Sequence, residues 1–321
     1  MNNLKKVGLT ALATSLITTS AFAGAVSVTG SASINLANQS NSTQGNGFSS
    51  GDSLNFSGSG ELDNGMTVTM KQEIDGGVMD DRSIAISMDG MGTLTINNHG
   101  GSSAMSAVDD VMPTAYGESW DVIGHTTASA SLTPGMAAKE GAIGGYATDN
   151  SFFYDAPEMV EGLDVNVSYS PSNTARPDGS VSWALAYTGV EGLTVDYAVG
   201  DTETVGAKAE ATTAKASYAY SSFTVSYSSN EYDTEAATGG QDITSWNLAY
   251  TVNDDISVAY GTETHDTEAQ GVDEEAEYVN VSYTTGGVTL SASQFMYEGS
   301  GNIAGSAGEK ERWALSATFA F

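Results

Sequence analysis

The chain has 321 residues, with 37 glycines, no cysteine and a formal net charge of −30 at pH 7. Such a charge would repel nucleic-acid phosphates and favours cations as partners. The lack of cysteine excludes a disulfide-stapled fold. Glycine together with abundant Ser, Thr, Tyr and Val is typical of strands and turns, so we expect an all-β fold.

The N-terminal segment is typical of an export signal. Lys5 and Lys6 precede a mostly apolar run over 7–17, and residues 21–23 (Ala-Phe-Ala) have the form of a cleavage site. The apolar run is short and interrupted, and no later stretch reaches the roughly 20 apolar residues that a spanning helix needs. We expect cleavage after Ala23, which would leave 24–321 as one domain with a formal charge of −32, because two lysines leave with the signal.

Short runs of alternating apolar residues recur along the rest of the chain and predict sixteen strands. The clearest hairpin signal is the turn Asp63-Asn64-Gly65. The predicted strands cover 26–36, 54–62, 66–70, 84–88, 94–96, 152–154, 165–169, 183–187, 193–197, 218–220, 223–227, 246–250, 256–260, 279–283, 288–292 and 310–321.

The predicted connections alternate between short turns and longer loops. The longer ones are 37–52, 73–81, 98–149, 171–181, 200–209, 230–241, 262–273 and 298–308. This alternation is typical of a closed, antiparallel, up-and-down outer-membrane β-barrel, with both termini on the short-turn side. The tyrosines near strand ends on the apolar faces fit an interfacial girdle: Tyr169, Tyr187, Tyr197, Tyr220, Tyr227, Tyr250, Tyr260 and Tyr283. Cross-strand aromatic packing in a soluble β-protein is the alternative.

The last predicted strand, 310–321, has two different faces. The apolar face carries Trp313, Leu315, Phe319 and Phe321, and the other face carries Lys310 and Arg312 among small residues. In a membrane barrel the first face would meet lipid and the second would meet water.

Three segments resemble the general diffusion porins of Gram-negative bacteria. Residues 150–171 (NSFFYDAPEMVEGLDVNVSYSP) are similar to a porin pattern of Asn-Ser-x-x-Tyr-x-x-Pro, Gly and a strand ending in Tyr-x-Pro. Residues 91–96 resemble the porin strand that leads into the third loop. The C-terminal strand, ending at Phe321, resembles the signal read by the outer-membrane barrel assembly machinery. The resemblance implies a sixteen-stranded barrel, usually a homotrimer, with a long third loop folded into the lumen and a channel for small hydrophilic solutes.

The segment 98–149 is the candidate constriction loop, because it is long and has little strand pattern. Its acidic residues outnumber its single lysine, Lys139, and include Asp109, Asp110, Glu118 and Asp121, as well as Glu140 and Asp149. The chain is more acidic and poorer in arginine than the better-known enteric porins, which leaves the presence of their arginine ladder open.

Basic residues of the wall are expected opposite this loop. Strand alternation places Lys71, Lys310 and Arg312 on the lumen face near the closure of the barrel, with Arg82 on the same arc at a strand edge. Lys215 is predicted to point inward from the tenth strand, away from this arc. The arrangement predicts a transverse field in a cation-preferring pore. Solvated wall charges without special geometry are the alternative.

No catalytic set stands out, so we expect neither an enzyme nor a cofactor. His99, His125 and His265 lie far apart, and there is no serine elbow or phosphate loop. Carboxylates on loops suit Ca²⁺ or Mg²⁺, although the spacing of the acidic runs matches no defined calcium loop and solvated charges explain them more simply. These runs are Asp80-Asp81, Asp109-Asp110, Asp254-Asp255 and Asp273-Glu274-Glu275 with Glu277.

The sequence therefore favours a passive outer-membrane porin for small polar solutes and cations, with the lipid bilayer as its surroundings. A substrate-selective pore of the same fold is one alternative, for which Phe153 and Phe295 are the inward aromatic candidates. An exported structural or adhesive β-protein is the other.

Overall fold

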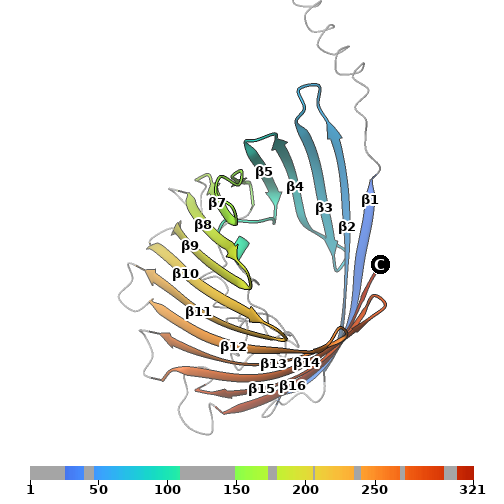
Figure 1. Ribbon diagram of the computed structural model, residues 1–321, viewed down its shortest axis with the longest axis vertical. Coiled ribbons are helices and arrows are strands. Elements are labelled where there is room, and N and C mark those ends of the chain that lie inside the picture. Colours follow the sequence, from blue (N-terminus) through green and yellow to red (C-terminus); the bar gives the residue numbers. More distant parts are fainter. Residues whose placement is uncertain are drawn as a thin grey trace, which may run out of the picture.

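The computed structural model describes residues 26–39, 47–108, 149–172, 179–204, 207–234, 240–267, 272–299 and 309–321. Sixteen antiparallel strands form one closed barrel, in which strands that are neighbours in sequence pair and β16 pairs with β1 (Figure 1). The predicted closed, up-and-down, all-β barrel is thus confirmed. The strands are β1 (Ser27–Gln39), β2 (Gly47–Glu61), β3 (Thr67–Asp75), β4 (Val78–Met88), β5 (Gly92–His99), β6 (Ser151–Asp155), β7 (Leu163–Ser170), β8 (Ser180–Val190), β9 (Leu193–Thr204), β10 (Ala207–Tyr220), β11 (Phe223–Thr234), β12 (Gln241–Asn253), β13 (Ile256–Thr267), β14 (Glu274–Thr285), β15 (Val288–Glu298) and β16 (Lys310–Ala320).

The observed strands extend well into the predicted long loops. β10 starts at Ala207, eleven residues before the predicted strand, and β2 starts at Gly47 inside the predicted loop 37–52. These extensions are rich in Ala, Ser, Thr and Gly, so they lack the apolar alternation that marks a strand. Their strand conformation comes from ladder hydrogen bonds to neighbouring strands, which a local pattern does not reveal.

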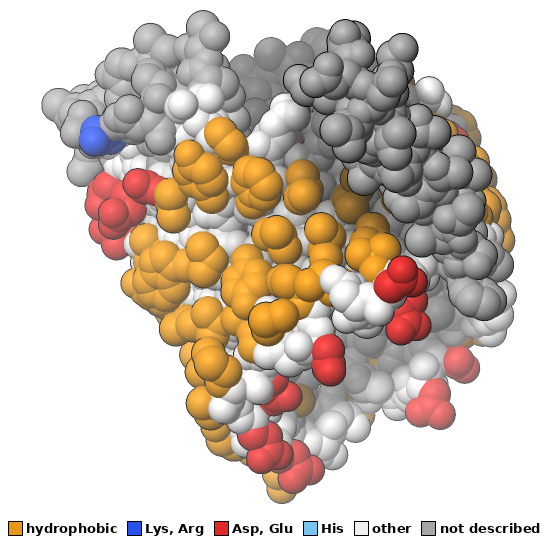
Figure 2. Space-filling view, turned by 90° about the horizontal axis from the view of Figure 1, so that it is seen from above, with side chains coloured by type: hydrophobic (Ala, Val, Ile, Leu, Met, Phe, Trp, Pro, Cys, Tyr) orange, Lys and Arg blue, Asp and Glu red, His pale blue; other side chains and the backbone are white. Residues whose placement is uncertain are grey.

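The two faces of the barrel wall have opposite character. Along β14, Glu274, Ala276, Tyr278 and Asn280 are buried on the inward face, whereas the outward Val279, Val281 and Tyr283 are exposed. Figure 2 shows outward hydrophobic side chains gathered into a broad patch with acidic side chains at its margins. A continuous apolar outer surface around a polar interior is the pattern of a barrel that meets lipid outside and water inside.

The outward tryptophans and tyrosines are unevenly distributed around the barrel. Residues 26–99, which contain β1–β5, have no tryptophan or tyrosine at all. The outward faces from β6 to β16 carry them, among others as Trp183, Tyr197, Trp246, Tyr250 and Trp313. The interfacial belt expected around a membrane barrel is therefore interrupted over β1–β5.

The barrel closes where β16 meets β1. Gly30 and Phe321 exchange backbone hydrogen bonds of 2.8 and 2.9 Å. A β-carbon at Gly30 would lie 2.7 Å from Cε2 of Phe321 and 2.9 Å from Cδ2 of Leu54, so the glycine leaves room for the terminal ring. Trp313, Leu315, Phe319 and Phe321 all face outward on this closing segment.

Helical structure within the described ranges is limited to a short 3₁₀ turn, η1 (Ser106–Val108). No helix in these ranges is both long and apolar enough to cross a membrane.

Candidate functional site

The first part of the predicted constriction loop folds into the barrel. After β5 the chain runs to η1, and Ala104, Met105 and Val108 are almost fully buried. They belong to one apolar cluster that includes the inward alanines Ala184 on β8, Ala198 on β9 and Ala211 on β10. This confirms the inward course of the loop as far as residue 108. The acidic residues Asp109, Asp110, Glu118 and Asp121 lie outside the described residues.

Two hydrogen bonds fasten this docked segment to the wall, and a third joins two of the wall strands beneath it. The Lys215 ammonium on β10 donates to the Val108 carbonyl at 2.5 Å, and the Ala104 amide donates to Oγ of Ser168 on β7 at 3.1 Å. Ser168 Oγ is in turn 2.5 Å from Oγ of Ser182 on β8. The anchoring residues come from three strands that lie far from β5 in sequence.

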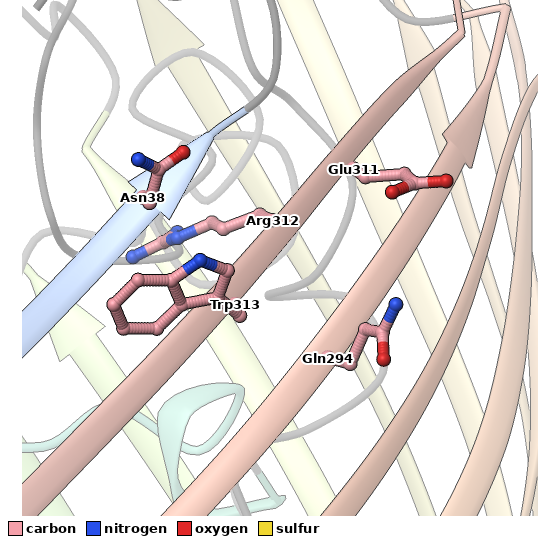
Figure 3. A pocket seen from close by; sticks show the side chains of 5 residues that line it. All are labelled: Asn38, Gln294, Glu311, Arg312 and Trp313. Carbon is pink, nitrogen blue, oxygen red and sulfur yellow. The ribbon is translucent and has the colours of Figure 1, made fainter. Parts of the chain in front are cut away.

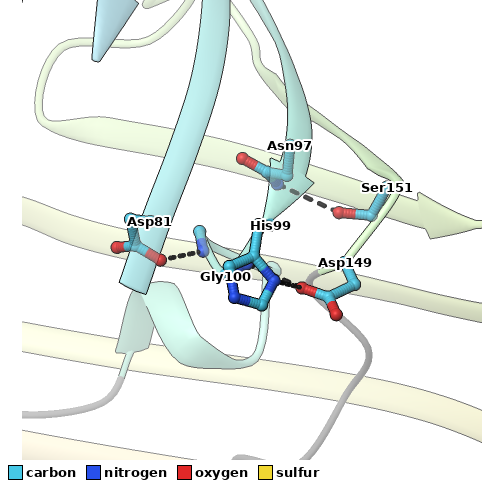
Figure 4. Close-up of polar contacts among 7 residues, drawn as sticks. Asp81, Asn97, His99, Gly100, Asp149 and Ser151 are labelled. Atoms are coloured by element: carbon cyan, nitrogen blue, oxygen red, sulfur yellow. Dashed lines mark hydrogen bonds and ion pairs between the residues drawn. The ribbon is translucent and has the colours of Figure 1, made fainter. Parts of the chain in front are cut away.

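Two aspartates hold the start of the loop, residues 100 and 101, in place (Figure 4). Asp81 accepts a hydrogen bond from the Gly101 amide at 2.6 Å, and Asp149 accepts one from the Gly100 amide at 2.7 Å. Nδ1 of His99 lies 3.1 Å from the same Asp149 oxygen. Asp149, predicted as part of the acidic constriction, therefore serves to join the start of the loop to its end.

Asn97 supports this start of the loop from the inward face of β5. Its amide nitrogen donates to Ser151 Oγ and to the Ser102 carbonyl, both at 3.0 Å. Gly100 has φ +56°, and a β-carbon there would overlap Asp81. The glycine is required at this position both by its conformation and by the close approach of the carboxylate.

The predicted basic residues occupy three different environments. Lys71 pairs with Ser57 and Ser83 in an inward row and is exposed. Lys310 and Arg312 are also inward but almost fully buried. Arg82 is exposed and pairs with Gln72, one residue beyond the Lys71 row, at a point where both of its ladders are irregular.

Arg82 and Lys215 stand apart from the other predicted basic residues. Arg82 does not share the inward row of Lys71, because it has the parity of the outward residue Ile84. Lys215 does point inward, but its ammonium is buried against the loop and does not line an open wall.

The wall beside Lys310 and Arg312 also carries buried acidic and aromatic side chains, of which the sequence pattern pointed only to Phe295 as inward. Glu263 and His265 on β13 and Glu274 on β14 are buried and inward. Nδ1 of His265 lies 3.3 Å from Oε2 of Glu274, and its Nε2 lies 3.2 Å from Oε1 of Gln241. The predicted basic side of the lumen therefore contains carboxylates of its own.

Three aromatic rings line up on the same wall. The centroids of Tyr278 and Phe295 are 6.1 Å apart, those of Phe295 and Tyr297 are 6.3 Å apart, and the Arg312 guanidinium lies 5.9 Å above the Phe295 ring. Phe295 had been predicted as inward. Strand parity alone would also have identified Tyr278 and Tyr297, since Val279 and Met296 face outward.

Arg312, on β16, lies beside the last residue of β1 and therefore near the long-loop end of the barrel. Its backbone pairs with Gln39, the last residue of β1. It lines a pocket of about 400 Å³ with Asn38, Gln294, Glu311 and Trp313, and Figure 3 shows its side chain directed toward Asn38. In the strand order, β16 lies across the barrel from β8–β10, and Phe295 beneath Arg312 belongs to the same apolar cluster as the docked loop segment.

One group of carboxylates in the described ranges has the spacing of a cation site. Single oxygens of Glu73, Asp80 and Asp81 lie within 4.8 Å of one another. Asp81 also accepts the Gly101 amide, and Ser53 donates to Glu73. The Asp254-Asp255 run instead occupies the short turn between β12 and β13.

A family model described as Gram-negative porin matches residues 8–284 of the chain. The chain belongs to the Gram-negative porin family. Together with the closed barrel, this membership identifies an outer-membrane porin channel. None of the curated proteins matches this porin.

Solved porin structures share the fold at low sequence identity. The anion-selective porin from Comamonas acidovorans is 15% identical, with a TM-score of 0.69, covering 92% of this chain and 99% of its own. Salmonella typhi OmpF in complex with daunomycin is 12% identical, with a TM-score of 0.69, covering 92% and 97%. The trimer form of Vibrio cholerae OmpT is 14% identical, with a TM-score of 0.68, covering 93% and 100%.

Proposed function

We propose that this porin is a passive channel for small hydrophilic solutes and ions, and that it is not an enzyme. The observation that supports this most directly is the two-faced wall, with an apolar outer surface and a polar inner one into which the loop segment docks. A polar, water-filled interior conducts according to its narrowest cross-section and its charge. Liposome swelling tests the proposal: uptake rates that fall smoothly with sugar size support it, and saturable uptake of one sugar supports a substrate-selective pore.

We further propose that the channel prefers cations. The inward acidic residues among those described outnumber the inward basic ones, which are Lys71, Lys215, Lys310 and Arg312, and the whole chain has a formal charge of −30. The inward acidic residues include Glu73, Asp155, Asp164, Asp196, Glu263 and Glu274. An excess of fixed negative charge concentrates cations in the pore. The Comamonas porin has the same fold and is named anion-selective, so the preference must be argued from charges. The reversal potential in a salt gradient tests its sign.

We infer that the porin forms a homotrimer through the outer face of β1–β5. This face lacks the tryptophans and tyrosines that anchor a lipid-facing surface. It still carries apolar side chains, including Val28, Ile34, Met70 and Ile84. The Vibrio cholerae OmpT structure is titled a trimer form. Migration of unboiled protein at three times the monomer mass supports the inference, and a purely monomeric species in mild detergent opposes it.

Further proposals concern export and ions. We propose that cleavage after Ala23 precedes insertion, that 24–321 is the mature domain, and that the barrel assembly machinery reads the closing segment through Trp313, Leu315, Phe319 and Phe321. The mass of the protein purified from outer membranes tests the cleavage site. The porin needs no resident cofactor in this account. Calorimetric titration with Ca²⁺ tests the carboxylates of Glu73, Asp80 and Asp81, and the absence of heat would remove them as a divalent site.

A further inference from the structure

We propose that Lys215 is a positioning residue that anchors the start of the third loop to the barrel wall, and that it does not act as a free charge of the pore lining. The proposal has two parts. The first part, that Lys215 holds residues 104–108 against the wall, follows from contacts in the structure alone. The effect of this docking on conductance rests on the proposed channel function.

The wall under the docked segment is built from very small side chains. Ala184 and Ala198 are register partners, as are Ala211 and Gly200. The three alanines are fully buried. This flat area accommodates the side chains of Met105 and Val108, which are 1% and 2% exposed. Burial of two apolar side chains favours docking but fixes no direction, because the hydrophobic effect is non-directional.

Lys215 fixes the position of the docked segment on this wall. Its ammonium, on a side chain that is 2% exposed overall, donates to the carbonyl of Val108, the last residue of η1. The final carbonyls of a helical turn have no partners within the turn, and the ammonium satisfies the one at Val108. A charged donor also gives a stronger bond than a neutral one.

Asp196 completes the arrangement on the neighbouring strand. It is the register partner of Lys215 on β9, is 4% exposed and interacts electrostatically with the lysine. A buried lysine is costly unless it is paired. With Asp196 beside it and the Val108 carbonyl in front of it, Lys215 is compensated inside the barrel. Its charge is therefore used locally and adds little to the field along the pore.

The test uses a single cysteine as a reporter of docking. The chain has no cysteine, so Met105→Cys places one thiol at a position that is 1% exposed. A water-soluble maleimide then labels the folded porin in proportion to the undocked population of residues 104–108, as amide exchange reports local opening. All further substitutions are compared in this Met105→Cys background, and unboiled gel migration confirms that each barrel is folded.

We expect Lys215→Met to raise the labelling rate at least about tenfold, which corresponds to about 1.4 kcal/mol in the docking equilibrium. Lys215→Met leaves the Asp196 carboxylate buried without its cation, so the double variant Asp196→Asn/Lys215→Met is measured as well and should label as fast. Asp196→Asn alone retains the bond to Val108 but removes the carboxylate partner of Lys215, so it should label at a rate between those of the parent and the double variant. Lys208→Met changes the same charge on the outward face of the same strand and should also label like the parent.

Equal labelling of the parent and the double variant, both folded, would overturn the anchor. The second measurement is single-channel conductance, which we expect to become higher and noisier in the double variant and unchanged in Lys208→Met. Faster labelling without any conductance change would support the anchor and overturn the proposed effect of docking on conductance. If the parent itself forms no channel, the proposed function fails, and the labelling result still decides the anchor.

Discussion

The stability cost of an arginine on the outer face of β12, compared with one on its inner face, tests whether the outer face meets lipid and the inner face meets water. Leu248 faces outward, is 41% exposed and lies between Trp246 and Tyr250 on its own strand. Its register partners, Val225 and Tyr260, belong to the same outward band. Leu248→Arg would therefore place a guanidinium in the middle of the apolar belt. The next residue, Ala249, is half-buried on the inward face, and Ala249→Arg is the matched control.

The expected cost follows from the medium that each face meets. An arginine on the lipid face near the bilayer midplane costs about 2–4 kcal/mol, whereas substitutions in the lumen mainly alter selectivity. The folding equilibrium should fall roughly 30- to 850-fold for Leu248→Arg. We expect Ala249→Arg to remain within about 1 kcal/mol of the parent, because its guanidinium can reach water in the lumen.

Denaturant unfolding in lipid vesicles, followed by tryptophan fluorescence, measures both free energies. Leu248→Arg within about 0.5 kcal/mol of the parent would contradict a lipid-facing surface. A cost for Ala249→Arg as large as that for Leu248→Arg would contradict a water-filled interior and would favour a soluble β-protein with a packed core.

Three further substitutions test other parts of the structure. Gly30→Val should destabilise the closure of the barrel by about 1–3 kcal/mol, because its side chain would overlap Phe321; an unchanged unfolding midpoint would contradict the packing of the terminal ring. Gly92→Val should abolish the folded band on unboiled gels, because Gly92 has φ +79° and its β-carbon would lie 2.2 Å from the Asp155 carbonyl; normal folding would show that this turn differs. Lys71→Gln should shift the reversal potential toward stronger cation preference, whereas Arg82→Gln, off the inward row, should leave it unchanged; equal shifts would contradict the assigned faces.

The fold was predictable because, within each strand, the alternation of apolar and polar residues indicates which face meets lipid and which meets water. In β14 the alternation of Val279, Val281 and Tyr283 with Asn280 and Ser282 is readable without any tertiary information. All sixteen strands carry such a marker somewhere along their length. The long-loop ends of β2 and β10 carry none, since small residues are compatible with strand or loop, and the ladder decides their state.

For the candidate site, the sequence predicted only whether side chains point inward or outward. Parity correctly gave the inward direction of Lys310 and Arg312, and the same rule would have found Tyr278 and Tyr297. Burial was not predictable, since it depends on contacts between distant segments. Lys215 and Val108 are 107 residues apart in sequence, and their bond follows from the course of the loop.

Local charge runs were the least informative part of the sequence. Asp149 looks like a lumen charge in the sequence, but in the fold it accepts the Gly100 amide and lies beside His99. Asp81 similarly accepts the Gly101 amide, although it is part of an acidic run. These carboxylates accept hydrogen bonds from the backbone amides of glycines in conformations that other residues rarely adopt. The pattern of charges in the sequence does not reveal such bonds.

Planar-bilayer recording of the purified porin across a salt gradient tests the central claim most directly. A water-filled, cation-preferring pore should give discrete conductance steps that scale with the conductivity of the bulk salt solution, and a reversal potential whose sign indicates cation preference. Absence of conductance from protein that migrates as a folded barrel would contradict the channel, and a reversal potential of the opposite sign would contradict its proposed selectivity.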